Sequence, residues 1–261
     1  MITKKQPQDW KELQQKVAKI LQECGFYVEI EKTINTARGK VEIDVYAEEI
    51  IDGRKNIILC ECKNWKQNIP QNVVLGFRSV MSDTGSNNGY IITTSDFQSG
   101  SKKANEFTNI ELLTWEEFQN VFLESWYIKC FYNKLDAINE INIDPIKVQF
   151  FEDYHLIERD FFRNNIDKYH FIQEVFEYFP SPLLREYPNT DFNVRNKLPL
   201  IDKIDKEKYE GWKMFCYEIP DGLLKEKYFE ELLNILSNYA KPVFKNLSKL
   251  NLEYNYEEYD D

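Results

Sequence analysis

Four charged residues near the start of the chain alternate with apolar residues in a way that could assemble a reactive site. Glu42 and Asp44 lie in one short apolar run, and Glu61 and Lys63 lie in the next. Alternation by two favours half-buried strands, on which every second side chain projects from the same face. Each pair therefore shares a face of its strand, and two neighbouring strands would gather three carboxylates and one ammonium group.

The link between the two runs predicts how the strands pair. Asp52-Gly53 is a strong signal for a two-residue hairpin turn. If this turn sets the register, paired residue numbers sum to 105, so Asp44 faces Glu61 and Glu42 faces Lys63. Directly opposed β-carbons lie roughly 5 Å apart. The other face of the two strands would then carry Ile43, Val45, Cys60 and Cys62.

Opposed carboxylates favour a metal ion. Asp44 and Glu61 would repel one another unless a cation joined them, and hard oxygen ligands select Mg²⁺ or Mn²⁺, with the backbone carbonyl of Cys62 as a further ligand. Such a metal activates water and polarises a phosphoryl oxygen, while Lys63 can orient the attacking water. This pattern predicts phosphodiester hydrolysis. The structural alternative is that Lys63 only pairs with Glu42 or Glu61 on a solvated sheet, an interaction worth about 0–1 kcal/mol.

The surrounding pattern predicts an α/β domain over residues 1–125, with a mixed central β-sheet flanked by helices. Asp9 is suited to cap a helix that ends at Gly25, and Pro70 is suited to begin a second helix. The expected strands are Tyr27–Ile34, Val41–Ala47, Asn56–Lys63, Tyr90–Thr93 and Ile110–Leu113, with a helix over Gln98–Phe107 and another from Trp115.

Residues 126–261 are expected to form a mainly α-helical second domain, to which the pattern assigns no role. Trp212–Ile219 reads as a possible strand and Leu223–Tyr239 as an amphipathic helix. The formal net charge of the chain is -11, but residues 1–125 hold 15 Lys/Arg against 18 Asp/Glu. The acidity is therefore mainly C-terminal and ends in an acidic tail, which is typical of a solvated or partner-binding segment.

Several classes of protein are disfavoured by composition. No apolar run approaches the length of a membrane span and no signal-peptide core is present, so a cytoplasmic protein without a membrane partner is expected. The five cysteines form one close pair, Cys60 and Cys62, with no second pair to complete a zinc site. His155 and His170 are remote from any nucleophile motif, and no phosphate-cradling glycine loop exists. Any ATPase subunit would have to be another chain.

Three ordered blocks of sequence resemble the Mrr-type branch of the PD-(D/E)XK restriction-endonuclease superfamily over roughly residues 9–120. The blocks are Val41-Glu42-Ile43-Asp44-Val45, Cys60-Glu61-Cys62-Lys63-Asn64-Trp65 and Gly89-Tyr90-Ile91-Ile92-Thr93-Thr94-Ser95-Asp96-Phe97. The resemblance implies a restriction-endonuclease-like fold in which Asp44 and Glu61 bind metal and Lys63 is the catalytic lysine. Many members carry Gln where this chain has Glu61, and Ile43 replaces the proline of the superfamily pattern.

Other positions have two readings each. By the resemblance, Glu12 corresponds to a metal-binding acid in the first helix, although acids in a first turn are also favoured by the helix dipole. Gln71 either contacts the metal shell or the DNA backbone, or is an ordinary helix residue. Thr94 and Ser95 precede a helix whose N–H groups could hold a phosphate; in the other reading Ser95 or Asp96 caps that helix.

The resemblance implies a metal-dependent DNA endonuclease acting in restriction or defence against foreign DNA, with DNA as its partner. A homodimer or a multi-protein defence complex is expected, because cutting both strands of a duplex needs two centres. One alternative is a junction or repair nuclease on the same fold, since a fold does not settle the substrate. Another is a nucleic-acid- or protein-binding module whose nuclease site is vestigial.

Overall fold

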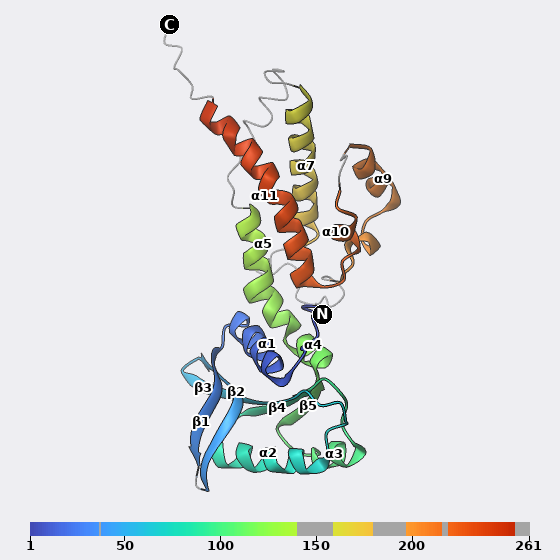
Figure 1. Cartoon of the computed structure of the whole chain (residues 1–261). Coiled ribbons are helices and arrows are strands. Elements are labelled where there is room, and N and C mark those ends of the chain that lie inside the picture. The colour runs from blue at the N-terminus through green and yellow to red at the C-terminus, as the bar shows by residue number, and fades with distance from the viewer. Residues whose placement is uncertain (37, 140–158, 180–196, 216–218, 254–261) are drawn as a thin grey trace. The chain divides into compact units, whose positions relative to one another are not determined.

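A computed structural model describes residues 1–36, 38–139, 159–179, 197–215 and 219–253 (Figure 1). The chain divides into two compact units, Met1–Cys130 and Phe131–Asp261. The first contains a five-stranded mixed sheet flanked by helices, and the described part of the second is helical. The expected fold class is therefore confirmed. Each unit is described by itself below.

The sheet of the first unit has the strand order β1-β2-β3-β4-β5. Its strands are β1 (Tyr27–Thr36), β2 (Gly39–Ile51), β3 (Arg54–Lys63), β4 (Asn88–Thr93) and β5 (Ile110–Thr114). The first three pair antiparallel, whereas β3, β4 and β5 run parallel. Parallel neighbours need a crossover, which α2 and α3 supply.

The turn between β2 and β3 has the expected geometry. Asp52 and Gly53 both have positive φ, 50° and 76°, as a type I′ turn requires. The predicted register is confirmed from Ile51↔Arg54 to Val45↔Cys60, where paired numbers sum to 105. A local dipeptide thus fixes which residues of the two strands approach one another.

Helices cover both faces of the sheet (Figure 1). The helices α1 (Trp10–Glu23) and α4 (Trp115–Trp126) lie on one face, and α2 (Gln71–Thr84) and α3 (Ser99–Ala104) lie on the other. The α2 face is filled by a buried apolar cluster of Ile43, Tyr46, Leu59, Ile69, Val74, Phe77, Met81, Ile91, Phe97, Ala104 and Ile110. This packing holds the sheet between two helical layers.

The first and last helices of this unit are joined directly. The Nε1–H of Trp126 donates to Oε2 of Glu23 at 2.6 Å, and the backbone N–H of Thr3 donates to Oε1 of Gln119 at 2.8 Å. Trp126 and Gln119 are both buried. The beginning of the unit is therefore fixed against its end.

In the second unit, α7 packs on α11 through Ile166, Ile172, Ala240, Val243, Phe244 and Leu247. Its elements are α5 (Tyr132–Asn139), α7 (Arg159–Glu177), a 3-10 turn (Leu200–Asp202), α9 (Lys206–Phe215), α10 (Asp221–Lys225) and α11 (Phe229–Glu253). A π-helical turn, Tyr127–Phe131, precedes α5. No described helix is long and apolar enough to cross a bilayer.

Two predictions for this unit are wrong. Trp212 belongs to α9 and not to a strand. On a strand, Trp212 and Met214 would project from the same face and be buried together. In the helix they project from different sides, and Met214 is 69% exposed. The helix expected over Leu223–Tyr239 is two helices, interrupted at Glu226, whose backbone is extended. Residues 216–218 and the acidic tail beyond residue 253 lie outside the described residues.

Candidate active site

Asp44 lies at an interruption of the sheet. The register between β1 and β2 skips Asp44 and the opposite residue Glu31, whose φ of 55° lies in the left-handed region. The ladder between β2 and β3 ends at Val45↔Cys60, one pair short of Asp44 and Glu61. Asp44 is thus outside regular pairing on both sides, so contacts of its side chain fix its position.

The interruption overturns two details of the predicted geometry. The β2–β3 ladder does not continue to Glu42 and Lys63, and Glu42 pairs instead with Thr33 of β1. Ile43 was expected on the face opposite Glu61. It belongs to the buried cluster of the α2 face together with Leu59, because the irregular backbone next to it breaks strict alternation.

The carboxylate of Asp44 is held from two sides. Its Oδ2 accepts a hydrogen bond from the backbone N–H of Cys62 at 2.7 Å, and its Oδ1 accepts one from Nε2 of Gln14 at 2.9 Å. Gln14 lies on α1 and is only 2% exposed. These two hydrogen bonds fix the orientation of the carboxylate.

Gln14 was not among the predicted site residues. The sequence did carry a signal for it, because Gln14, Val17, Ala18 and Leu21 have the spacing of one buried helical stripe and all four are buried. A glutamine in such a stripe needs a partner inside the fold. Which partner it has could not be read from local pattern, since Asp44 is 30 residues away.

Glu61 and Lys63 form a direct ion pair on β3, with side chains only 24% and 21% exposed. Burial, and then the charge of Asp44, raise the pKa of Glu61 even though Lys63 acts in the other direction. Burial alone would lower the pKa of Lys63, but the neighbouring Glu61 and Asp44 reverse that effect and raise it. The structure therefore brings Asp44, Glu61 and Lys63 together in a partly desolvated site.

The donor set fits a hard divalent cation that keeps open coordination positions. Within the described residues, no group of three or more His, Cys, Asp or Glu side chains is arranged to hold a metal. Two carboxylates are nevertheless sufficient for Mg²⁺, which commonly takes one or two of them together with waters and substrate phosphates. The thiols of Cys60 and Cys62 are buried, and burial raises the pKa of each, which disfavours a thiolate-bound zinc.

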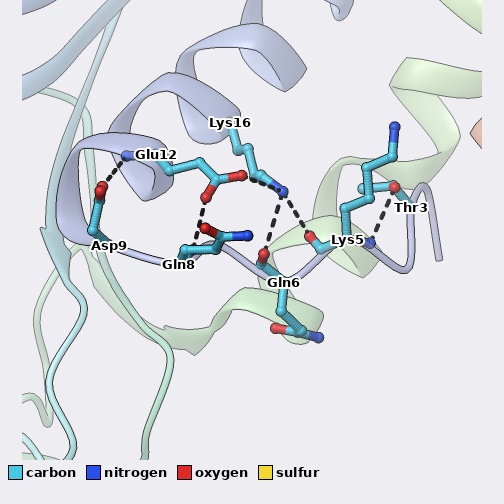
Figure 2. Close-up of polar contacts among 7 residues, drawn as sticks. All are labelled: Thr3, Lys5, Gln6, Gln8, Asp9, Glu12 and Lys16. Carbon is cyan, nitrogen blue, oxygen red and sulfur yellow. Dashed lines mark hydrogen bonds and ion pairs between the residues drawn. The ribbon is translucent and has the colours of Figure 1, made fainter.

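Glu12 is occupied elsewhere (Figure 2). Its carboxylate accepts from the backbone N–H of Gln8 at 2.8 Å and pairs with Nζ of Lys16 at 3.1 Å, while its own N–H donates to Asp9. Two residues along a helix correspond to a rotation of about 200°, so Glu12 and Gln14 project from different sides of α1. The structure places Glu12 in the cap of α1 and not beside Asp44.

Thr94 and Ser95 connect two loops at the carboxyl ends of β3 and β4. Oγ1 of Thr94 donates to Oδ1 of Asn64 at 2.7 Å, and Oγ of Ser95 donates to the carbonyl of Gln67 at 3.0 Å. These hydroxyls thereby join the segment after β4 to the segment after β3, close to the end of the lysine strand.

The helix after this loop is shorter than expected. It covers only Ser99–Ala104 and has Gln98 as its N-cap, so neither Ser95 nor Asp96 caps it. The Asp96 carboxylate accepts instead from the N–H of Phe97 at 2.6 Å. Gln71 begins α2 and is exposed. Its Oε1 lies close to Gly100 of α3, at 3.3 Å from the position that a β-carbon on this glycine would take.

Part of the first unit matches a known protein family. Residues 6–122 match the Mrr_cat family, described as a restriction endonuclease. This match confirms the resemblance of the segment to the Mrr-type branch of the PD-(D/E)XK superfamily. The match ends before the second unit begins at Phe131. No curated protein matches the chain.

Among solved structures, the chain is similar to the crystal structure of a protein of unknown function, AF1548, with 26% sequence identity and a TM-score of 0.37. The match covers 45% of this chain and 66% of that one. The superposition is too poor to add to the argument.

The third block of similarity, Gly89–Phe97, supports β3, the strand that carries Lys63. Lys63 and Thr93 are partners in the parallel register of β3 and β4, and Oγ1 of Thr93 donates to the carbonyl of Lys63 at 2.9 Å. Thr93 is fully buried. The end of β3 that carries Glu61 and Lys63 is therefore anchored by side chain as well as by sheet.

Proposed function

We propose that the chain is a metal-dependent DNA endonuclease in which Asp44 and Glu61 bind Mg²⁺ or Mn²⁺ and Lys63 is the catalytic lysine. The observation that carries this proposal is the convergence of the three side chains where β2 leaves regular pairing. The backbone carbonyl of Cys62 is a further proposed ligand. The match to a restriction-endonuclease family supports hydrolysis of nucleic acid.

The residues of the site have separable tasks. Asp44 is oriented by Gln14 and by the N–H of Cys62. Glu61 adds a second carboxylate, and the resulting accumulation of negative charge attracts a divalent cation. Lys63 offers N–H donors that can orient an attacking water and offset charge on the phosphoryl oxygens. A bound cation would supply Lewis acidity and lower the pKa of its water.

The remaining candidates receive more limited proposals. We place the exposed amide of Gln71 against the DNA backbone. For Thr94 and Ser95, their bonds to Asn64 and to the Gln67 carbonyl favour a positioning role over direct phosphate binding. The contacts of Glu12 with Gln8 and Lys16 favour a capping role over metal binding.

The biological setting follows the description of the family. We propose restriction or defence against foreign DNA in the cytoplasm, by a homodimer or a larger defence complex, since breaking both strands needs two centres. A junction or repair nuclease would use the same residues on a different substrate. A vestigial binding module is the less favoured reading, because the acid, acid and lysine trio is complete.

The test is cleavage of plasmid and phage DNA, methylated and unmethylated, with Mg²⁺ or Mn²⁺. Asp44→Ala and Lys63→Ala should each lower the rate by about 10²–10³-fold, the usual effect of removing one transition-state contact. Lys103→Ala, at an exposed lysine on α3, is the matched control and should cut normally. Cleavage that survives in EDTA or in both site variants would contradict the proposal. A monomeric mass on DNA by light scattering would contradict the homodimer.

A further inference from the structure

Trp65 is exposed beside the proposed active site. It lies two residues after Lys63, and 44% of its surface is accessible. Consecutive Cα atoms are about 3.8 Å apart, so the backbone of Trp65 lies within about 8 Å of that of Lys63. Trp115, Trp126 and Trp212 are buried, whereas Trp10 on α1 is also exposed, at 46%. What distinguishes Trp65 is its place two residues after Lys63.

The loop that presents Trp65 is fastened on both sides. Asn64 accepts from Oγ1 of Thr94 at 2.7 Å, and the carbonyl of Gln67 accepts from Oγ of Ser95 at 3.0 Å. Only Trp65 and Lys66 lie between these two attachments. The loop is therefore held in one conformation without burying the indole.

The attachment continues beyond Gln67. The N–H of Ile69 donates to the carbonyl of Asp96 at 2.8 Å, and the Ile69 carbonyl accepts from the N–H of Gln98 at 3.0 Å and from Oγ of Ser101 at 2.6 Å. Ile69 is fully buried. The two loops thus form one rigid unit at the carboxyl ends of β3 and β4, and a side chain presented on it loses little entropy on binding.

Lys66, the next residue in the chain, adds a positive charge to the same loop. It is exposed, and it makes no ion pair with any residue in the described part of the chain. The neighbouring acid of the same unit, Asp96, pairs with Lys102 at 3.3 Å. An exposed aromatic ring beside a free ammonium group has the chemistry that binds an unstacked nucleotide, with the base on the ring and the phosphate on the lysine.

Resting on the proposed nuclease function, we infer that Trp65 and Lys66 bind an unpaired nucleotide next to the phosphate to be cut. A base inside an intact duplex has both faces covered by its neighbours, so the indole can stack only on a single-stranded, flapped or frayed base. The preferred substrate class is therefore DNA with an unpaired nucleotide at the cleavage position. Trp65 contributes binding and selectivity, and the metal site contributes the chemistry.

Binding can be measured without cleavage, by fluorescence anisotropy of labelled oligonucleotides with the full chain in EDTA. Three probes are needed: a 20-nucleotide single strand, a blunt duplex and a duplex with a flap. Trp65→Ala should weaken binding of the single strand and the flap by roughly 5- to 150-fold, the range for loss of one stacked base, and leave the duplex nearly unchanged. Trp65→Phe should keep most of the affinity.

Two further readouts separate stacking from a general loss of structure. Nucleotide binding should quench tryptophan fluorescence in the wild type, and Trp65→Phe should remove most of that quenching. Lys66→Ala should reduce the slope of log affinity against log salt by about 0.7 for the single strand. The control is Phe107→Ala, since Phe107 is a fully exposed aromatic that precedes β5, at the other end of the parallel strands.

The outcomes distinguish this inference from the nuclease proposal. Equal binding of all probes by wild type and Trp65→Ala, or equal losses for duplex and single strand, would overturn the inference even if the protein cuts DNA. Tight binding of a protein partner at Trp65 without any response to oligonucleotides would overturn it as well. Absence of both DNA binding and metal-dependent cleavage would refute the nuclease function itself.

Discussion

The contact between Gln14 and Asp44 allows a quantitative prediction. Gln14→Leu removes the amide that donates to Oδ1 of Asp44 at 2.9 Å but keeps a side chain of similar size in a site that is 2% exposed. A hydrogen bond to a charged group contributes about 1.5–3 kcal/mol, and loss of a residue that orients a metal ligand typically costs about 10–100-fold in metal affinity or activity. Since the N–H of Cys62 still holds Oδ2, we expect the lower end, about tenfold.

The assay is the initial rate of plasmid cleavage over a series of Mg²⁺ concentrations. Gln14→Leu should require about tenfold more Mg²⁺ for half-maximal rate and should recover much of its activity when Mg²⁺ is saturating. Gln15→Leu is the matched control, because Gln15 is the neighbouring residue on α1 and is exposed. Thermal unfolding by circular dichroism establishes that both variants are folded.

Two results would refute this reasoning. An unchanged Mg²⁺ requirement in folded Gln14→Leu would mean that the amide does not orient Asp44. An equal shift in Gln15→Leu would mean that the effect arises from α1 as a whole. A lowered maximal rate with an unchanged Mg²⁺ requirement would point to a contact with substrate and would equally contradict a positioning role.

Three further predictions concern pH, the hairpin and the helix cap. The Mg²⁺ concentration needed for half-maximal rate should rise as the pH falls, because burial and the charge of Asp44 raise the pKa of Glu61 and protons then compete with the metal; an Mg²⁺ requirement that does not depend on pH contradicts this. Gly53→Ala should destabilise the fold by about 1–2 kcal/mol, since φ is 76°, whereas Gly76→Ala, in open space on α2, should stabilise it by up to about 1 kcal/mol in chemical denaturation. Glu12→Gln should leave the Mg²⁺ requirement unchanged; a weaker metal response would restore Glu12 as a ligand.

The parts of the fold that depend on local pattern were predictable. The Asp52-Gly53 turn permits positive φ at both positions, and it fixed the register as far as Val45↔Cys60. Alternation then indicated that Asp44, Glu61 and Lys63 would gather. A two-residue turn leaves one register available to the two strands.

The parts that depend on distant contacts were not predictable. The left-handed backbone of Glu31 and the pairing gap at Asp44 depend on how β1 and β2 pair. Neither residue type predicts these features. Gln14 was visible as a polar residue in a buried stripe, but its partner was not. In the second unit, the sequence around Trp212 suggested a strand, but Trp212 lies in α9 and its ring packs on Phe171. This contact between distant residues cannot be read from local pattern.

The junction between α1 and α4 has a consequence for synthesis of the protein. Trp126 and Gln119 anchor residues near the start of the chain, and α1 carries the glutamine that orients Asp44. A ribosome releases Asp44, Glu61 and Lys63 early, but α1, whose Gln14 orients Asp44, gains its last support only after α4 has emerged. We therefore expect a nascent chain to acquire its proposed hydrolytic centre late, when the whole first unit can close, so that incomplete fragments have little nuclease activity.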